Sequence, residues 1–263
     1  MKNALLIPCY NYANNLAQTL QKIKFWNEAL HEHFQVCVID DGSTDNTAAI
    51  LEEFLATNYT WFQFLRLPHN LGKGAAIQKG MQLFIKKSDH IFFTDCDLHY
   101  GLPIIHERLL PLLQENDIVI ADRSWVASSN HEAISRRLSS YIFNRLMGQF
   151  TGVTLRDSQA GCKGFKTSSC MPIFEMMKIK GFAFDVEILS IAMFYRLRIA
   201  QVPVRFENEH QFPEESSIKI LRSSFTMMLD LIRINLRWKR GKYKNSLLEK
   251  RIDDQIYTIK SEF

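Results

Sequence analysis

The amino-acid sequence predicts an α/β fold built on a mainly parallel sheet with flanking helices. Short apolar runs rich in β-branched residues alternate with segments of helical spacing through the first half of the chain. Such runs are typical of strands that are buried on both faces. Regular alternation favours a doubly wound sheet, in which ligands bind beyond the carboxyl ends of the strands. The residues that follow each strand are therefore the first candidates for a functional site.

Six strands are expected along the chain. They cover residues 4–7, 36–39, 62–67, 90–94, 118–121 and 199–204. Helices are expected where apolar residues recur every three or four positions. This spacing occurs around residues 16–23, 48–55, 76–84, 134–150, 182–195 and 216–240. These elements predict one principal domain, residues 1–215, followed by a C-terminal segment, residues 216–263.

Composition indicates a chain that folds around a large core in a reducing compartment. With 263 residues, 46% of them hydrophobic, the chain can form a core large enough to be stable without covalent cross-links. Its five cysteines are widely spaced, which is not typical of a disulfide framework or a zinc site. The first apolar stretch is too short for a signal peptide, and no window approaches the roughly 18 apolar residues of a membrane span. We therefore expect free thiols and a cytoplasmic location.

Positive charge is concentrated at the C-terminal end. Residues 216–263 contain eleven Lys or Arg and five Asp or Glu, a net charge of +6, whereas the whole chain carries +4. An anionic surface is therefore the expected partner of this segment. A nucleic-acid role is disfavoured, because the cations lack interleaved aromatic residues.

Residues 216–240 have the pattern of a basic amphipathic helix. The apolar stripe comprises Ile218, Leu221, Phe225, Met228, Leu229, Ile232 and Leu236. The opposite side comprises Arg222, Thr226, Asp230, Arg233, Arg237 and Arg240. Such a helix can lie in the interface of a membrane that contains anionic lipids. The alternative is a helix that packs on the domain or in a homodimer, since a core-facing helix has the same stripe.

Two aspartates, Asp95 and Asp97, follow the strand expected at residues 90–94. Carboxylates at i and i+2 project to the same side and form a hard oxygen site suited to Mg²⁺ or Mn²⁺. A metal there would bridge a diphosphate and neutralise the charge on a departing nucleotide. His99 is a candidate third ligand and favours Mn²⁺ somewhat. The alternative is an ordinary acidic turn, because Asp-x-Asp is common by chance.

Polar residues also follow the other strands. Pro8-Cys9-Tyr10-Asn11 follows the first strand. Asp40-Asp41 follows the second, where carboxylates can accept hydrogen bonds from a nucleobase or ribose. Ser43 and Thr44 are good N-caps, so plain loop and cap chemistry is the alternative there. Gly72-Lys73-Gly74 opens a helix after the third strand, where the backbone can approach an anion and Lys73 adds a charge.

Together these motifs resemble the family 2 glycosyltransferases of the GT-A fold. The matching residues are Ile7-Pro8-Cys9-Tyr10-Asn11, Val38 through Thr47, Asn70-x-Gly72-Lys73-Gly74 and Asp95-x-Asp97. The resemblance implies a Rossmann-like GT-A domain with a nucleotide-sugar half at about residues 1–125 and an acceptor half at about residues 126–215. It implies donor contacts from Pro8, Tyr10, Asn11, Asp40, Asp41, Lys73 and Asp95. It also implies a metal held by Asp95, Asp97 and His99.

The second half looks most like the polyprenyl-phosphate sugar transferases within that family. The matching residues are Asp122-Arg123, Arg137-x-x-Ser140-x-x-x-Asn144, Arg156 through Phe165, Gly181 through Glu187 and Val202-Pro203-Val204. By this resemblance Arg123 and Arg137 would contact the phosphate of the acceptor. Lys219 is a further candidate for a phosphate contact.

A hydroxyl acceptor and a phosphate acceptor make different chemical demands. A hydroxyl must lose a proton as it attacks, so it needs a general base. A phosphate monoester arrives already anionic and needs cations to hold it. Arg123, Arg136 and Arg137 suit the phosphate. The candidates for a base, or for residues that orient the arginines, are Asp157, Asp185 and Glu187.

The sequence therefore predicts an inverting hexosyltransferase, peripheral at the inner face of a membrane. It would move a sugar from a UDP- or GDP-sugar to a polyprenyl phosphate of the dolichyl or undecaprenyl type. The expected catalytic groups are Asp97, Arg123, Arg137, Asp157, Asp185 and Glu187. One alternative is a family 2 enzyme of polysaccharide synthesis that acts on a saccharide hydroxyl. Another is an inactive lipid- or nucleotide-binding partner.

Overall fold

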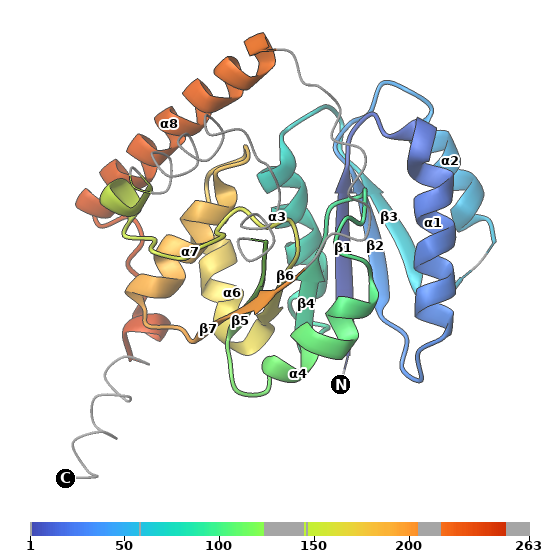
Figure 1. Ribbon diagram of the computed structural model, residues 1–263, viewed down its shortest axis with the longest axis horizontal. Helices are drawn as coiled ribbons and strands as arrows, with labels where there is room; N and C mark the ends of the chain where they lie inside the picture. Colours follow the sequence, from blue (N-terminus) through green and yellow to red (C-terminus); the bar gives the residue numbers. More distant parts are fainter. Residues whose placement is uncertain (1, 58, 124–144, 146, 205–216, 251–263) are drawn as a thin grey trace.

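The fold is a single seven-stranded sheet with helices packed around it (Figure 1). The computed structural model describes residues 2–57, 59–123, 145, 147–204 and 217–250. The strands are β1 (Asn3–Cys9), β2 (Gln35–Asp40), β3 (Phe62–Arg66), β4 (His90–Phe93), β5 (Ile118–Asp122), β6 (Lys163–Lys166) and β7 (Ile199–Pro203). Their order in the sheet is β3-β2-β1-β4-β6-β5-β7. The expected α/β fold class is confirmed.

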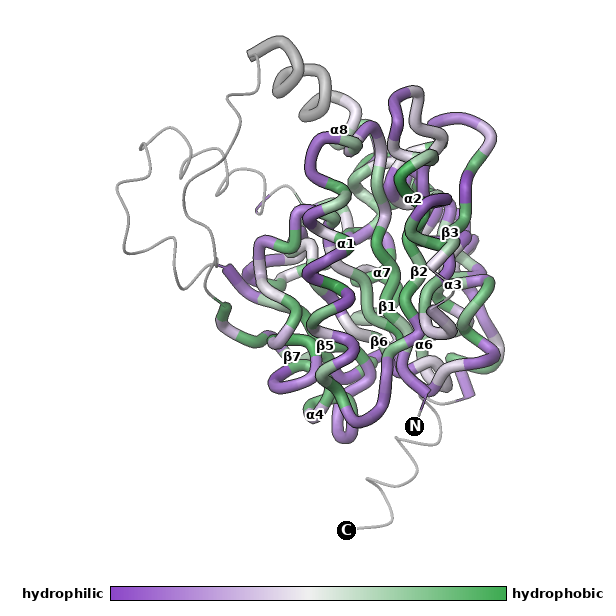
Figure 2. The backbone as a smooth tube through the Cα atoms, turned by 90° about the vertical axis from the view of Figure 1, so that its right-hand side faces the viewer, coloured by the Kyte–Doolittle hydropathy of each residue, from purple (hydrophilic) through white to green (hydrophobic). Residues whose placement is uncertain are grey.

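All strands run parallel except β6, which is antiparallel to both of its neighbours, β4 and β5. Because helices cover the sheet, every residue of β1, β4 and β5 is buried, whereas the edge strands β3 and β7 are mostly half-buried or exposed. Figure 2 shows the hydrophobic stretches of the chain gathered along the central strands. The six expected strands are confirmed, with ends that differ by at most two residues.

The seventh strand, β6, is absent from the sequence prediction. It is only four residues long, and Lys163 and Lys166 stand at its two ends. Gly164 lies at its centre, where an added Cβ would overlap the ring of Phe92 on β4. A short strand that combines lysines with a glycine lacks the apolar pattern on which strand prediction depends.

The described helices are α1 (Ala13–Glu28), α2 (Thr47–Leu55), α3 (Lys73–Phe84), η1 (Ile105–Leu109), α4 (Leu110–Leu112), α6 (Thr167–Met176), α7 (Phe184–Phe194) and α8 (Ser217–Lys239). Helix α1 packs against α2, and both α3 and α6 pack against α7. The helix expected at residues 134–150 lies mainly outside the described residues.

None of the described helices is long and apolar enough to cross a membrane. All five cysteines are free and buried, as expected.

Helix α8 contacts α7 near its C-terminal end, where Trp238 Nε1 donates to Ser190 Oγ at 2.7 Å, and it carries apolar side chains on two faces. Leu231 and Ile234 are fully buried. Leu229, Ile232 and Leu236, from the predicted stripe, are 37%, 38% and 42% exposed. The helix therefore packs on the domain through one face and leaves Leu229, Ile232 and Leu236 of the predicted stripe exposed.

Candidate active site

The predicted donor residues meet at one edge of the sheet, where the parallel strands end. Asp40 is the last residue of β2, and Asp95 and Asp97 come just after β4. Lys73 is the first residue of α3, and its ammonium group forms an ion pair with Asp95 Oδ1. The topology thus joins residues that lie more than fifty positions apart in the chain.

Asp95 and Asp97 form a partly exposed acidic pair. Their side chains are 33% and 38% exposed. Burial and the charge of Asp95 raise the pKa of Asp97 above its ordinary value. His99 Nε2 lies 3.0 Å from Asp97 Oδ2. Two neighbouring carboxylates of this kind carry excess negative charge that a divalent cation would neutralise.

The metal ligands predicted from the sequence are not assembled as a three-residue cluster. Within the part of the chain that the structure describes, no group of three or more His, Cys, Asp or Glu side chains is arranged to hold a metal ion. Lys73 contacts Asp95, and His99 contacts Asp97. The residues nevertheless fit a divalent ion, because Asp95 already binds a cationic group and hard carboxylate oxygens are the ligands that Mg²⁺ and Mn²⁺ prefer.

A glycine makes room for the Asp95 carboxylate. An added Cβ at Gly161 would overlap Asp95 Oδ2. The backbone N–H of Gly161 donates to the hydroxyl of Tyr100, at 3.1 Å. The segment before β6 therefore lies directly against the acidic pair, although it is more than sixty residues away in sequence.

The two aspartates after β2 have different surroundings. Asp40 is fully buried; its Oδ1 accepts a hydrogen bond from Ser43 N at 2.8 Å. Its Oδ2 is buried without a hydrogen-bond partner, although Arg66 Nε lies 3.4 Å away. Asp41 instead accepts from the N–H groups of Leu71 and Gly72, each at 2.8 Å. Asp41 therefore fixes the loop that leads to Lys73. In Asp40, Oδ2 can still accept a hydrogen bond from a further donor.

The residues after β1 support the same loop cluster. Asn11 adopts a left-handed backbone conformation, with φ 49°, and its Oδ1 accepts from Thr44 N at 2.8 Å. Ser43 Oγ accepts from Asn11 N at 2.9 Å. Neither Ser43 nor Thr44 caps a helix, since the N-cap residue of α2 is Asn46. Tyr10 is 45% exposed, whereas Pro8 is buried within β1.

The glycines before α3 allow a second loop to approach. Gly72 has φ 100°, and an added Cβ would lie 2.6 Å from the carbonyl oxygen of Lys180. At Gly74 it would lie 2.7 Å from the carbonyl oxygen of Ile179. Ala75 N donates to Lys180 O at 3.2 Å. The loop between α6 and α7 therefore packs against the turn that presents Lys73.

The second half of the chain contributes a partly exposed cation, Arg123, to this edge of the sheet. Arg123 follows β5 and is bonded to Asp157 through Nε at 2.6 Å and a terminal nitrogen at 2.7 Å. Burial acts to raise the pKa of Asp157, but the hydrogen bonds and charge of Arg123 outweigh it, so the pKa is lowered. Asp157 thus holds the Arg123 guanidinium in place. Arg136 and Arg137 lie outside the described residues.

Asp185 and Glu187, at the start of α7, are buried inside the domain. Asp185 Oδ1 lies 2.8 Å from Nζ of Lys163, and neither side chain is more than 5% exposed. Burial raises the pKa of Asp185 and lowers that of Lys163. Glu187 is fully buried and accepts hydrogen bonds from Lys178 N, Ile179 N and the hydroxyl of Tyr243. Both carboxylates therefore have polar partners within the fold.

This arrangement agrees with the family to which the sequence belongs. The sequence model of glycosyl transferase family 2 matches residues 4–174, which include β1 to β6 and the acidic pair. The chain belongs to glycosyl transferase family 2.

The curated relatives of this family 2 glycosyltransferase include several dolichyl-phosphate beta-glucosyltransferases. The protein from Saccharomyces cerevisiae is 27% identical over 261 residues, which cover 92% of this chain and 77% of the yeast protein. The protein from Dictyostelium discoideum is 28% identical over 254 residues, with coverage of 92% and 76%. The human protein is 28% identical over 256 residues, with coverage of 92% and 77%.

Solved structures of glucosyl-3-phosphoglycerate synthase from Mycobacterium tuberculosis share the fold. Its complex with UDP has a TM-score of 0.64 and 18% identity, covering 89% of this chain and 80% of the synthase. Its complex with Mn²⁺, UDP-glucose and phosphoglyceric acid has a TM-score of 0.63 and 18% identity, with coverage of 89% and 79%. The GT-A fold expected from the sequence is confirmed.

Sequence reasoning missed several residues that shape the site of this family 2 glycosyltransferase. They are Arg66 beside Asp40, Tyr100 and Gly161 beside Asp95, Lys163 beside Asp185, and Tyr243 beside Glu187. Gly161 and Lys163 lie within the motif Arg156 through Phe165, which carries the family resemblance. That motif could have indicated both residues as candidates. The contacts of Arg66, Tyr100 and Tyr243 depend on tertiary structure and leave no pattern in the sequence.

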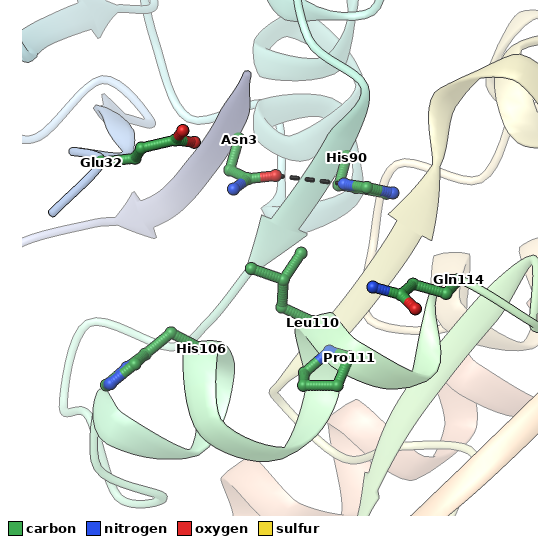
Figure 3. A pocket seen from close by; sticks show the side chains of 7 residues that line it. All are labelled: Asn3, Glu32, His90, His106, Leu110, Pro111 and Gln114. Atoms are coloured by element: carbon green, nitrogen blue, oxygen red, sulfur yellow. Dashed lines mark hydrogen bonds between the residues drawn. The ribbon is translucent and has the colours of Figure 1, made fainter. Parts of the chain in front are cut away.

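A pocket of about 390 Å³ lies at the opposite end of the sheet (Figure 3). Its lining includes Asn3 and His90, the first residues of β1 and β4, which are joined by a 3.1 Å contact. Asp95 and Asp97 follow the other end of β4. This pocket is therefore separate from the acidic pair and from the loops that surround it.

Proposed function

We propose that this chain is an inverting, metal-dependent glycosyltransferase that moves glucose from a UDP-sugar to a polyprenyl phosphate. The observation that carries the proposal is the partly exposed Asp95–Asp97 pair, joined to Lys73 at the carboxyl ends of the strands. The names of the relatives support glucose and a dolichyl-type acceptor. Among the similar solved structures, the complexes with UDP support uridine as the base.

The donor would be held by residues of the first half. The buried Oδ2 of Asp40 lacks a hydrogen-bond donor, and an N–H of the nucleobase would supply one. The ammonium group of Lys73 would move from Asp95 to the donor diphosphate. Asp95 and Asp97, with His99 beside them, would hold Mn²⁺ or Mg²⁺. The bound ion would supply charge neutralisation for the departing diphosphate.

The acceptor would be held by Arg123. Two of its five N–H groups bond to Asp157, which fixes the plane of the guanidinium. Its side chain is 36% exposed, so the other donors could bind an anionic acceptor. A phosphate oxygen is already deprotonated and can attack the sugar without a general base. Arg137 remains a candidate for a second phosphate contact.

The surroundings of the three candidate bases favour phosphate over a hydroxyl acceptor. Asp157 is bonded to Arg123, Asp185 to Lys163, and Glu187 to two backbone N–H groups and a tyrosine hydroxyl. A general base needs a carboxylate that can reach the proton it removes. Positioning roles suit these three residues better than proton abstraction.

A panel of sugar donors tests the proposal. The purified chain would be incubated with radiolabelled UDP- or GDP-sugars, Mn²⁺ or Mg²⁺, and dolichyl phosphate in detergent. We expect label to enter the organic phase with UDP-glucose and a divalent ion. Label that stays in the aqueous phase and appears on added oligosaccharides would instead identify a saccharide acceptor. Nucleotide binding without turnover of any donor would identify an inactive binding partner.

We also propose that α8 docks the enzyme on the inner face of a membrane. Leu229, Ile232 and Leu236 form an exposed apolar strip, and the exposed cations Arg233 and Arg240 flank it. An apolar strip flanked by cations suits a surface of anionic lipids, where each cation contributes about 1 kcal/mol. A lipid-linked acceptor requires the enzyme to work at such a surface.

Vesicle binding tests the docking proposal. Replacing Arg233 and Arg240 with Gln should weaken binding to phosphatidylserine vesicles about thirtyfold, because about 2 kcal/mol is lost. Replacing Ile232 with Gln should weaken it further, whereas Leu55→Gln, at an equally exposed position on α2, should not. Binding that survives the loss of both arginines and of Ile232 would exclude α8 as the docking helix.

A further inference from the structure

The loop between α6 and α7 touches the donor residues on one side and the C-terminal segment on the other. We call residues 178–181 the bracing loop. Its Lys180 O accepts from Ala75 N at 3.2 Å, and its backbone closes over Gly72 and Gly74. Gly72 and Gly74 lie on either side of Lys73. The position of the bracing loop therefore sets the turn from which Lys73 reaches Asp95.

Glu187 holds the bracing loop from inside the domain. Its Oε2 accepts from Lys178 N at 2.8 Å and from Ile179 N at 2.7 Å. The carboxyl group is fully buried, and burial raises its pKa. Charge-assisted hydrogen bonds to buried backbone N–H groups are strong, and leaving those N–H groups without an acceptor is costly. Glu187 is thus the anchor of this loop.

The C-terminal segment in turn holds Glu187. The hydroxyl of Tyr243, a fully buried residue, donates to Glu187 Oε1 at 2.6 Å. Arg237 Nε on α8 lies 3.9 Å from the same oxygen. Asp230 on α8 lies over the loop itself, since its Oδ2 is 3.5 Å from the position of a Cβ at Gly181. The bracing loop is therefore enclosed between α8 and the start of α3.

We propose that Glu187 is a positioning residue that makes residues 226–248 of the C-terminal segment a structural part of the donor site. Tyr243 fixes Glu187, Glu187 fixes the bracing loop, and the loop fixes the turn that presents Lys73. The inference rests on the proposed function only in taking Lys73 and Asp95 as donor contacts. Because the chain of contacts is continuous, loss of the hydrogen bond between Tyr243 and Glu187 weakens nucleotide binding, and nucleotide binding stabilises that hydrogen bond in return.

The first test compares two buried tyrosines that tie down the same segment. Tyr243→Phe removes the hydroxyl that bonds to Glu187. Tyr195→Phe is the matched control, because the Tyr195 hydroxyl donates to Tyr243 O at 2.6 Å and the described contacts of that hydroxyl do not include Glu187. The readouts are UDP affinity in the presence of Mn²⁺, measured by calorimetry, the thermal midpoint of unfolding, and KM and kcat for the donor.

We expect Tyr243→Phe to weaken UDP binding about fivefold, which corresponds to one lost hydrogen bond of ordinary strength. KM for the donor should rise by the same factor while kcat stays within about twofold of wild type. Tyr195→Phe loosens the backbone of Tyr243 but keeps the Tyr243 hydroxyl that bonds to Glu187, so it should lower the thermal midpoint and change UDP affinity by less than about twofold. Equal UDP affinity in Tyr243→Phe and wild type, or equal weakening in the two variants, would overturn the inference.

A second test varies the anchor itself. In Glu187→Gln the amide oxygen can still accept from Lys178 N and Ile179 N, whereas Glu187→Ala leaves both without an acceptor. We expect the Gln variant to bind UDP within about threefold of wild type and the Ala variant to lose about tenfold or more. A Gln variant as weak as the Ala variant, with both folded, would contradict the positioning role. Should the Ala variant fail to fold, the tyrosine pair still decides the matter.

These outcomes separate the inference from the proposed function. A wild-type chain that binds neither UDP nor GDP, with Mn²⁺ or with Mg²⁺, would overturn the donor site and this inference with it. Wild-type binding that is insensitive to Tyr243→Phe would overturn the inference alone.

Discussion

The acidic residues after β4 and those at the start of α7 share the same chemistry but have opposite surroundings. Asp95 and Asp97 are about one-third exposed, and each contacts a nitrogen group that a ligand could displace, on Lys73 or His99. Asp185 and Glu187 are at most 5% exposed and are bonded to groups inside the fold. Carboxylates of the first kind are available to a ligand, and carboxylates of the second kind stabilise the structure around it.

This contrast separates the acidic residues predicted from the sequence into those that can bind a ligand and those that stabilise the fold. A buried carboxylate whose charge is already balanced cannot take up a metal or a proton without breaking a contact. Two partly exposed carboxylates that repel each other are stabilised when a divalent ion binds between them. Substitutions at the buried carboxylates should therefore lower the stability of the fold. Substitutions at the partly exposed pair should instead weaken ligand binding.

The largest effect is expected at the buried ion pair. Lys163→Met leaves Asp185 charged and unpaired in the interior, which should lower the free energy of unfolding by about 3–5 kcal/mol. The double variant Lys163→Met, Asp185→Leu removes both charges and should recover most of that loss. Denaturant unfolding measures both. A single variant as stable as wild type would show that the pair does not hold the fold.

A smaller effect is expected where the fold touches the acidic pair. Gly161→Ala places a methyl group against Asp95, which must move. We expect a loss of stability of about 1–3 kcal/mol and a rise of about tenfold in the Mn²⁺ concentration that gives half-maximal sugar transfer. Gly148→Ala is the control, since its added Cβ meets only Val153 O at 3.5 Å. An unchanged Mn²⁺ requirement in Gly161→Ala would separate this segment from the metal site.

The smallest effect is a dependence of stability on acid pH. The pKa of Asp157 is lowered in the folded protein, so the unfolded chain binds more protons at pH values between the lowered pKa and the ordinary 3.8. The stability that Asp157 contributes is therefore present above about pH 4 and is lost as the pH falls through the lowered pKa. Thermal unfolding of wild type and Asp157→Asn should differ at pH 6 and converge near pH 2. A constant difference over this range would contradict the Arg123 pairing.

The elements with a continuous apolar pattern could be predicted from the sequence, and the contacts between them could not. Strands β1, β2, β4 and β5 were predicted because nearly all of their residues are buried and therefore apolar, whereas the edge strands β3 and β7 were predicted from their apolar runs although most of their residues are only half-buried or exposed. Strand β6 was missed because Lys163 is fully buried, which a sequence pattern does not indicate. Its partner Asp185 comes twenty-two residues later, and only the fold joins them.

The same limit applies to the site and to α8. Asp95, Asp97 and Lys73 could each be named from their places after strands or at the start of a helix. Their mutual contact follows from the packing of α3 beside β1 and β4, which is a tertiary feature. In α8 the exposed residues Leu229, Ile232 and Leu236 were predicted as part of one apolar stripe, but the buried face through Leu231 and Ile234 was not predicted, because a helix that is apolar on two faces offers no single stripe to choose.

The measurement that tests the account most directly is Mn²⁺-dependent binding of UDP to wild type and to Asp97→Asn. Calorimetric titration should show that wild type binds UDP much more tightly with Mn²⁺ than with EDTA. Asp97→Asn should lose about a hundredfold in affinity with Mn²⁺ and should unfold within about 0.5 kcal/mol of wild type, because its side chain is partly exposed. A folded Asp97→Asn variant that keeps the full Mn²⁺-dependent affinity would contradict the metal site on which the proposed function depends.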